Sequence, residues 1–153
     1  MRRIAKFILL FSTIAIISCN TQHILVSNDH VLAELIPSKD FNQFYSKKSL
    51  DKKLSKYLLK ERNFDFQMVD SGELVNTTDM RVEGLPDKRL IVFGKSSSNL
   101  FCILYNERES QFNNSCLIYS KRKNVYTVCF LTVSSSVNNI EELKIAVKKG
   151  QYN

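Results

Sequence analysis

The feature that most constrains the fold is a series of strand-like segments in the second half of the chain. Four apolar segments, 90–93, 100–105, 116–119 and 125–133, are separated by short polar stretches at 96–98, 107–114 and 121–123. Connections this short cannot carry a crossover, so consecutive strands must pair as antiparallel hairpins. The sequence therefore predicts a β-meander.

Two of these segments are apolar at consecutive positions, which indicates a sheet that is covered on both faces. Residues 100–105 read Leu-Phe-Cys-Ile-Leu-Tyr, and residues 128–131 read Val-Cys-Phe-Leu. A half-exposed antiparallel strand would instead alternate apolar and polar residues. The expected helices can cover one face, and the other needs the N-terminal segment, a curled sheet or a partner.

An amphipathic helix is predicted before the meander, from Ser49 to about Arg62. Its apolar face carries Leu50, Leu54, Tyr57 and Leu58, and lysines at 52, 53, 56 and 60 occupy the remainder. We interpret the lysines as the solvated back of a core helix. The alternative is that they rest on a membrane surface, as basic amphipathic helices do.

A second helix is predicted at the C-terminus, over about 139–149. Asn138 or Asn139 can cap it, with Glu141 or Glu142 three residues later, and Gly150 ends it. Its buried stripe is Ile140, Leu143, Ala146 and Val147. The expected fold class is α+β: an antiparallel meander of about four or five strands, an amphipathic helix before it, and the C-terminal helix packed on the sheet.

Two shorter segments between these elements are less clear. Residues 31–36 form an apolar stretch that ends at Pro37, compatible with a strand or a helical turn. From Phe64 to Arg89 we expect loops and one short strand around Met80 to Glu83.

The first nineteen residues have the composition of an export signal. Arg2, Arg3 and Lys6 precede an apolar run over residues 7–17, and Ser18-Cys19 follows. The run is about half of the roughly 20 residues that a helix needs to cross a bilayer, so a permanent transmembrane span is not expected. An ordinary cleavage site would prefer a small residue where Ile16 stands.

The stretch Ile16-Ile17-Ser18-Cys19 resembles the lipobox of bacterial lipoproteins. The resemblance covers the signal only. It implies cleavage between Ser18 and Cys19, a diacylglycerol on the Cys19 thiol, and an acylated (palmitate-type) amino terminus. We therefore divide the chain into a signal peptide (1–18), an anchor and tether (19–29) that can join the sheet as an edge strand, and one globular domain (30–153).

The same resemblance implies a location in the cell envelope. The residue directly after Cys19 is Asn20, not Asp, and no acidic cluster follows, so we expect an outer-membrane lipoprotein that faces the periplasm. The formal charge of +7 falls when Arg2, Arg3 and Lys6 leave with the signal. The remaining excess lacks the concentrated basic stripe of a nucleic-acid-binding protein, and the expected partners are the membrane and an envelope protein.

With Cys19 assigned to lipid, three thiols remain: Cys102, Cys116 and Cys129. They lie in apolar strands, where a free cysteine behaves as a small buried hydrophobe. The alternative is a disulfide between Cys116 and Cys129, because an even-length turn centred on Arg122-Lys123 would place these two residues opposite one another. Both interpretations stay open at this point.

No motif for catalysis, a metal or a cofactor withstands inspection. Gly94-Lys95-Ser96 lacks the earlier glycine of a phosphate-binding loop, since Arg89 stands there, and a strand follows it. The two histidines, His23 and His30, have no zinc-ligand spacing. We therefore expect no catalytic residues, no metal site and no cofactor.

The expected function is that of a lipid-anchored, non-catalytic binding or interaction module. Aromatic residues about the predicted hairpins are of the kind that interfaces favour: Tyr105, Phe112, Tyr119 and Tyr126. The alternatives are an immunity or inhibitor lipoprotein against an envelope-targeted enzyme, and a small envelope hydrolase. A cleft with converging carboxylates would favour the hydrolase, and an exposed apolar sheet face would favour a binder.

Overall fold

The fold is described by a computed structural model over residues 23–26, 28–62, 67–76, 83–107, 112–123 and 125–153. Its centre is a seven-stranded sheet in the order β1-β7-β6-β5-β4-β2, with β3 paired to the same strand, β4, as β2. The strands are β1 His23–Val26, β2 Phe41–Phe44, β3 Met68–Val69, β4 Lys88–Ser96, β5 Leu100–Glu107, β6 Asn113–Arg122 and β7 Val125–Ser134. The helices are α1 Asn28–Leu35, the short 3-10 helix η1 Lys47–Ser49, α2 Lys52–Arg62 and α3 Ile140–Lys148.

The predicted α+β class and its central meander are confirmed. Strands β4 to β7 pair in sequence order, each antiparallel to the next. Each is longer than its apolar core, because the pairing continues into polar residues at the ends of the strands. The hydrophobic pattern therefore located the strands, and the backbone pairing set their limits.

Three short strands complete the sheet at its margins. β1 pairs in parallel with β7, so the expected tether segment does join the sheet as an edge strand. β2 pairs antiparallel with one end of β4, and β3 pairs in parallel with the other. Neither β2 nor β3 was predicted, because one is four largely exposed residues and the other has only two. Most of the strand expected around Met80 to Glu83 lies outside the described residues.

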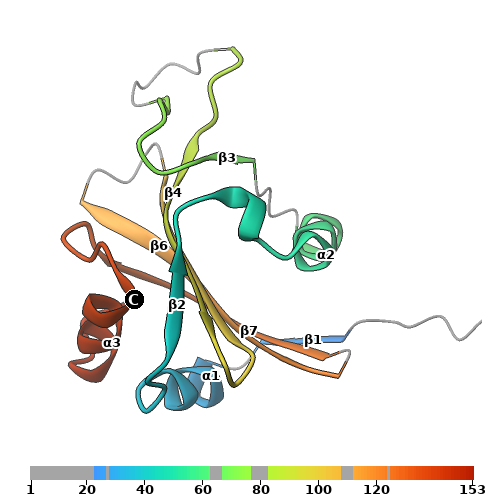
Figure 1. Cartoon of the computed structure of the whole chain (residues 1–153), viewed down its shortest axis with the longest axis vertical. Helices are drawn as coiled ribbons and strands as arrows, with labels where there is room; N and C mark the ends of the chain where they lie inside the picture. Colours follow the sequence, from blue (N-terminus) through green and yellow to red (C-terminus); the bar gives the residue numbers. More distant parts are fainter. Residues whose placement is uncertain (1–22, 27, 63–66, 77–82, 108–111, 124) are drawn as a thin grey trace, which may run out of the picture.

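One face of the sheet, here called the thiol face, lies beneath α1 and α3 (Figure 1). The ambiguous segment 31–36 is mostly helical, and α1 contributes buried Val31, Leu32 and Leu35. From α3 the predicted stripe is buried as expected, with Ile140 and Leu143 fully inaccessible. The three cysteines of the domain lie among these side chains.

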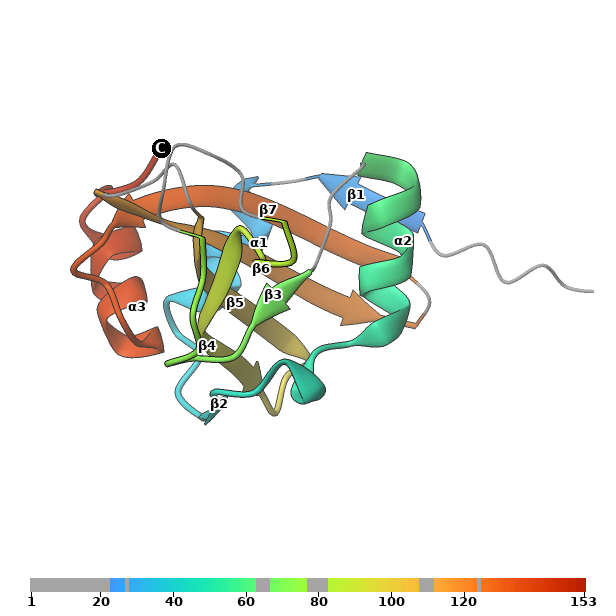
Figure 2. The same cartoon turned by 90° about the horizontal axis from the view of Figure 1, so that it is seen from above.

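The opposite face, here called the aromatic face, lies beneath α2 and β3 (Figure 2). Five aromatic rings follow one another across it, each within about 6 Å of the next: Phe44, Phe93, Phe101, Tyr119 and Tyr126. They come from β2, β4, β5, β6 and β7 in turn. Both faces are thus covered by the chain itself over most of their area, as the consecutive apolar residues indicated.

The helix predicted from Ser49 begins at Lys52. Asp51 precedes its first turn as the cap: one carboxylate oxygen accepts hydrogen bonds from the backbone N–H of Lys53 at 2.9 Å and of Leu54 at 3.4 Å. Ser49 instead ends η1. Three residues of the predicted packing face are confirmed, since Leu54 and Leu58 are buried and Leu50 packs against the same cluster. The side chain of the fourth, Tyr57, lies outside those described.

Helix α3 has the predicted signals at both ends. The Asn139 side chain accepts from the Glu142 N–H at 2.9 Å, and the Glu142 carboxylate accepts from the Asn138 N–H at 2.7 Å. At the other end Gly150 has a φ of 67°, and Gln151 N–H reaches back to the Ala146 carbonyl at 2.9 Å. Local sequence alone fixes the limits of this helix.

The register of the β6–β7 hairpin corrects one expectation. Arg122 pairs with Val125, so the turn lies one residue further along than the expected centre at Arg122-Lys123. Lys123 in this turn has a φ of 56°, the left-handed conformation that two-residue hairpin turns use. Moving the centre by one residue moves each partner by two, so Cys116 is opposite Leu131 and Cys129 is opposite Ile118.

Candidate functional site

The predicted lipidation site, Cys19, lies outside the described residues. The other three cysteines are free and buried on the thiol face. Cys102 and Cys129 flank Ile118 on its two neighbouring strands, and Cys116 lies two residues before Ile118. The direct pairing on which a Cys116–Cys129 disulfide depended is therefore wrong.

The three thiols are poor nucleophiles where they lie. Burial raises the pKa of Cys102 and Cys116 well above the ordinary value, and it raises the pKa of Cys129 to about 11, with the nearby Asp29 charge adding to the effect. The thiolate is the reactive form. These side chains therefore act as small apolar packing groups at neutral pH.

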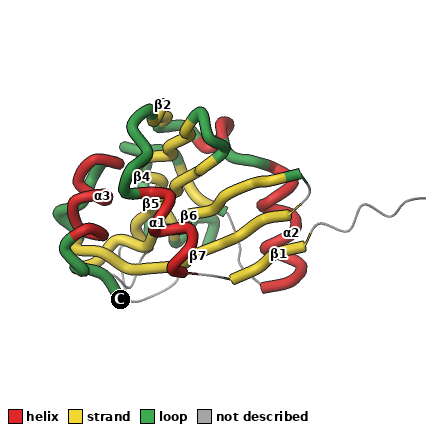
Figure 3. The backbone as a smooth tube through the Cα atoms, turned by 90° about the horizontal axis from the view of Figure 1, so that it is seen from below, coloured by secondary structure: helices red, strands yellow, loops and turns green. Residues whose placement is uncertain are grey.

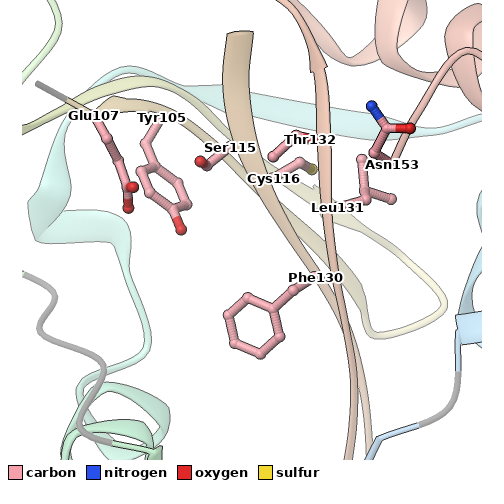
Figure 4. Close-up of a pocket in the computed structure, with 8 residues that line it drawn as sticks. All are labelled: Tyr105, Glu107, Ser115, Cys116, Phe130, Leu131, Thr132 and Asn153. Carbon is pink, nitrogen blue, oxygen red and sulfur yellow. The ribbon is translucent and has the colours of Figure 1, made fainter. Parts of the chain in front are cut away.

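A pocket of about 230 Å³ opens on the sheet where the aromatic face is less fully covered (Figure 4). Along β7 the exposed fraction rises from 0% at Tyr126 and Val128 to 36% at Phe130. In Figure 4 the side chains of Tyr105, Glu107, Ser115 and Phe130 lie on one side of β6 and β7. The lining is Tyr105, Glu107, Ser115, Cys116, Phe130, Leu131, Thr132 and Asn153.

Strand register explains why these residues meet. Tyr105 on β5 is opposite Ser115 on β6, and Ser115 is opposite Thr132 on β7. The three form one row across the sheet, with hydroxyl groups at each position. Phe130 is two residues from Thr132 and therefore points to the same face. The pocket thus combines a polar row with one exposed aromatic ring.

The C-terminal tail supports the pocket from the far edge of β7. Thr132 N–H donates to the Asn153 carbonyl at 2.8 Å, and Asn153 N–H donates to the Thr132 carbonyl at 3.1 Å. This exchange of two bonds continues the sheet beyond the point where β1 leaves β7. It holds the outer wall of the pocket in place.

The polar groups at the pocket interact through hydrogen bonds and charge. Burial raises the pKa of the Tyr105 phenol, the Glu107 charge adds to this, and hydrogen bonds link the phenol to Ser115 and Glu107. Glu107 is 38% exposed and lies 3.9 Å from the Lys88 ammonium group. The phenol therefore stays protonated. It forms a neutral and almost fully buried end of the row, beside the Glu107 carboxylate.

The pocket brings together hydroxyl groups, one carboxylate side chain and one exposed aromatic ring. A glycosidase mechanism uses two carboxyl groups about 5–10 Å apart, whereas Glu107 is the single carboxylate side chain among the described lining residues. Within the described ranges no three His, Cys, Asp or Glu side chains group as metal ligands.

None of the helices in the described part of the chain is long and apolar enough to span a bilayer.

A second polar cluster ties α2 to the β6–β7 hairpin. One Asp51 oxygen accepts from the Lys121 ammonium at 3.0 Å and from the Tyr126 hydroxyl at 3.2 Å. Partial burial raises the pKa of Asp51, but the hydrogen bonds from Lys121 and the helix N–H groups outweigh it and leave the pKa below its usual value. The Lys121 ammonium also lies 5.2 Å from the centre of the Tyr126 ring.

Sequence reasoning found part of the pocket and missed the rest. Tyr105 was among the aromatic residues expected near the hairpins, but Tyr119 and Tyr126 of that group are fully buried. Phe112 is 79% exposed and is not among the residues that line the pocket. Phe130 and Ser115 had no local signal, because their role depends on which half of the sheet face the helices leave open.

Comparison with known proteins gives no relative: no family model, no curated protein and no solved structure matches the chain.

Proposed function

We propose that the protein is a lipid-anchored component of the bacterial cell envelope, held in the outer membrane by Cys19 and facing the periplasm. The support is the Ile16-Ile17-Ser18-Cys19 sequence after a basic and apolar leader. The first strand begins at His23, four residues after Cys19. Two or more acyl chains anchor a protein stably, so the domain needs no membrane span of its own.

We further propose that the domain acts as a non-catalytic binding module through the pocket at the aromatic face. The observation that carries this proposal is the exposed Phe130 ring beside the row Tyr105, Ser115 and Thr132. An aromatic side chain with a few fixed polar groups is the usual composition of a recognition site. We expect the ligand to present an apolar group to Phe130 and a hydrogen-bond acceptor or donor to the hydroxyl row.

The anchor is tested by replacing Cys19. In a bacterial host, Cys19→Ala should accumulate as an uncleaved precursor, whereas the wild type should be processed and carry acyl chains by mass spectrometry. The matched control is Cys102→Ala, a thiol of the folded domain that the lipid pathway does not use. Wild-type protein that is released from membranes without detergent would refute the anchor.

The pocket is tested by photo-crosslinking in the intact envelope. A photoreactive phenylalanine analogue at position 130 should capture one defined partner. The same analogue at position 145 should not, because Ile145 is 52% exposed but lies on α3, outside the pocket lining. An identical product at both positions, or none at position 130, would contradict binding at this pocket.

A further inference from the structure

We propose that the outer face of α2 and the β6–β7 turn rest on anionic lipid headgroups of the membrane that holds the anchor. This surface, here called the basic end, comprises Lys52, Lys53, Lys56, Leu59 and Lys60 of α2 with Lys123 of the turn. The inference rests on the proposed lipidation of Cys19. It adds an orientation: the domain lies with its basic end against the bilayer.

The anchor enters the fold beside the β6–β7 turn. His23, the first residue of β1, pairs with Val125, and Val125 directly follows the two-residue turn after Arg122. A chain spans at most about 3.6 Å per residue, so the four residues from Cys19 to His23 reach no further than about 14 Å. The turn must therefore stay close to the membrane surface.

Helix α2 lies at the same end of the molecule. Its cap, Asp51, contacts Lys121 and Tyr126, which flank the turn on β6 and β7. Figures 2 and 3 show α2 beside β1 at this end, with α3 at the opposite end. The lipid attachment therefore brings α2, and not α3, to the bilayer.

The charge of α2 complements an anionic surface. Its sequence, KKLSKYLLKER, holds five basic residues and one acidic residue, and the lysines at 52, 53, 56 and 60 are all exposed. Lys47 and Lys48 of η1 and Lys123 of the turn are also exposed. Asp51, just before α2, is bound to Lys121 of β6, and the net charge of the α2 sequence stays positive. In α3, by contrast, Glu141 and Glu142 balance Lys144 and Lys148.

An exposed leucine lies within the lysine field. Leu59 is 51% exposed, although Leu54 and Leu58 of the same helix are buried in the core. Lys52, Lys56, Leu59 and Lys60 follow the i, i+4, i+7, i+8 spacing of one helical face. A leucine among lysines on one face is the pattern of helices that lie in the membrane interface. Its position among the lysines places the Leu59 side chain where it can enter the headgroup region, which the equally exposed Ile145 on α3 cannot do in this orientation.

The experiment uses the mature lipoprotein, purified from membranes and reconstituted into two kinds of vesicle. One is phosphatidylcholine alone, and the other also contains phosphatidylglycerol. An environment-sensitive fluorophore is attached at Leu59→Cys or, as the matched control, at Ile145→Cys; the two native side chains are 51% and 52% exposed. The native domain thiols are buried and do not compete for the label.

We expect the emission of the fluorophore at position 59 to shift to the blue on mixed vesicles at low salt. High salt screens the charges and should reverse this shift. The fluorophore at position 145 should show no shift. The double variant Lys53→Gln/Lys56→Gln should suppress the shift. Each lysine near an anionic surface raises the affinity for the membrane about five-fold, and the variant removes two. The matched variant Lys148→Gln/Lys149→Gln, on the α3 side, should not. Equal shifts at positions 59 and 145 would overturn the orientation.

The two proposals fail in different ways. Protein that associates with both kinds of vesicle but shows no shift at position 59 would overturn the docking and leave the anchor intact. Protein that does not associate with phosphatidylcholine vesicles would overturn the anchor. A shift at position 59 in native membranes but not in protein-free vesicles would assign the basic end to a protein partner, and would also overturn lipid docking.

Discussion

The two faces of the sheet are built from the same strands but differ in how completely they are closed. On the thiol face, α1 and α3 cover aliphatic side chains and three small thiols, and the hydrophobic side chains from β4 to β7 are buried except for partly buried Ile91. On the aromatic face, larger rings lie beneath α2, and exposure increases toward Phe130 and the pocket. The difference indicates that the thiol face provides stability, while the aromatic face also provides the surfaces for recognition.

The helices that cover the two faces also differ, in their charge and in how they are joined to the sheet. Helix α3 joins the thiol face with balanced charge and capped ends. Helix α2 joins the aromatic face through Leu54 and Leu58 and through the ion pair between Asp51 and Lys121, and several of its lysines are exposed. Substitutions on the two faces should therefore have different consequences, and four of them test this comparison.

The largest effect is expected from Leu143→Ala on α3. Leu143 is fully buried on the thiol face, and truncating a buried leucine costs about 2–5 kcal/mol of unfolding free energy. The control is Ile145→Ala on the same helix, which is 52% exposed and should change stability by less than about 0.5 kcal/mol. Urea titration of both variants gives the comparison, and equal losses would show that α3 does not close the face as described.

A second substitution tests how tightly α3 packs on the strands. A Cβ atom at Gly94 would lie 2.8 Å from two carbons of the Ile140 side chain and 3.1 Å from a carbon of the Phe41 ring. Gly94→Ala should therefore lower the unfolding free energy by about 1–3 kcal/mol through overpacking. In a strand with open space at this position, the same change would stabilise the fold. Adding Ile140→Val removes one of the close carbons, so the double variant should lose less than the sum of the two changes. Strict additivity in denaturant titration would refute the contact.

The sequence predicted the thiol face better than the aromatic face. Consecutive apolar residues located the meander strands, and the spacing of Ile140, Leu143, Ala146 and Val147 located the packing side of α3. These signals are local, since periodicity and capping act within a few residues. The β6–β7 register was predicted incorrectly, because a turn centred one residue later satisfies the same pattern of alternating faces.

The aromatic face depends on contacts that no short segment encodes. β2 and β3 are ordered by pairing with β4, from which they are separated by 43 residues (45–87) and 18 residues (70–87). Their own sequences are too short to indicate strands. The pocket needs Tyr105, Ser115 and Thr132 in one row, and that row follows from two registers. Composition predicted aromatic residues near the hairpins, but only tertiary packing decides that Tyr126 is buried and Phe130 exposed.

A third substitution acts on the link between α2 and the sheet. Asp51→Ala removes the helix cap and the partner of Lys121. It should lower the unfolding free energy, measured by urea titration, by about 0.5–2 kcal/mol. Asp51→Asn keeps a capping oxygen and removes the charge, so it should cost less. Asp40→Ala, at an exposed carboxylate, is the control.

The same carboxylate gives this link a pH dependence. Because the pKa of Asp51 is below its usual 3.8 in the folded protein, its contribution is fully present above the unfolded pKa and is lost as the pH falls through the folded value. The stability difference between the wild type and Asp51→Asn should therefore shrink as the pH falls below about 4. A difference that stays constant from neutral pH into this acid range would show that the ionic link contributes nothing.

The smallest effect on stability is expected at Phe130, and the neighbouring residue makes the sharpest control. Phe130 and Leu131 are adjacent on β7, so their side chains point to opposite faces. Leu131 is 5% exposed on the thiol face, and Leu131→Ala should cost about 2–5 kcal/mol. Phe130 is 36% exposed at the pocket, and Phe130→Ala should change the unfolding free energy by no more than about 1 kcal/mol.

When binding is measured, the order of the two effects should reverse: Phe130→Ala should lose more capture than Leu131→Ala. Phe130→Ala removes the ring that the pocket presents, so capture of the partner should fall while the protein stays folded and anchored. A folded fraction of Leu131→Ala should retain more of the capture than Phe130→Ala: Leu131 belongs to the pocket lining, but its side chain lies on the side of β7 away from the Phe130 ring (Figure 4). If Phe130→Ala destabilised the domain as much as Leu131→Ala, the ring would be part of the core, and the aromatic face would be closed like the thiol face.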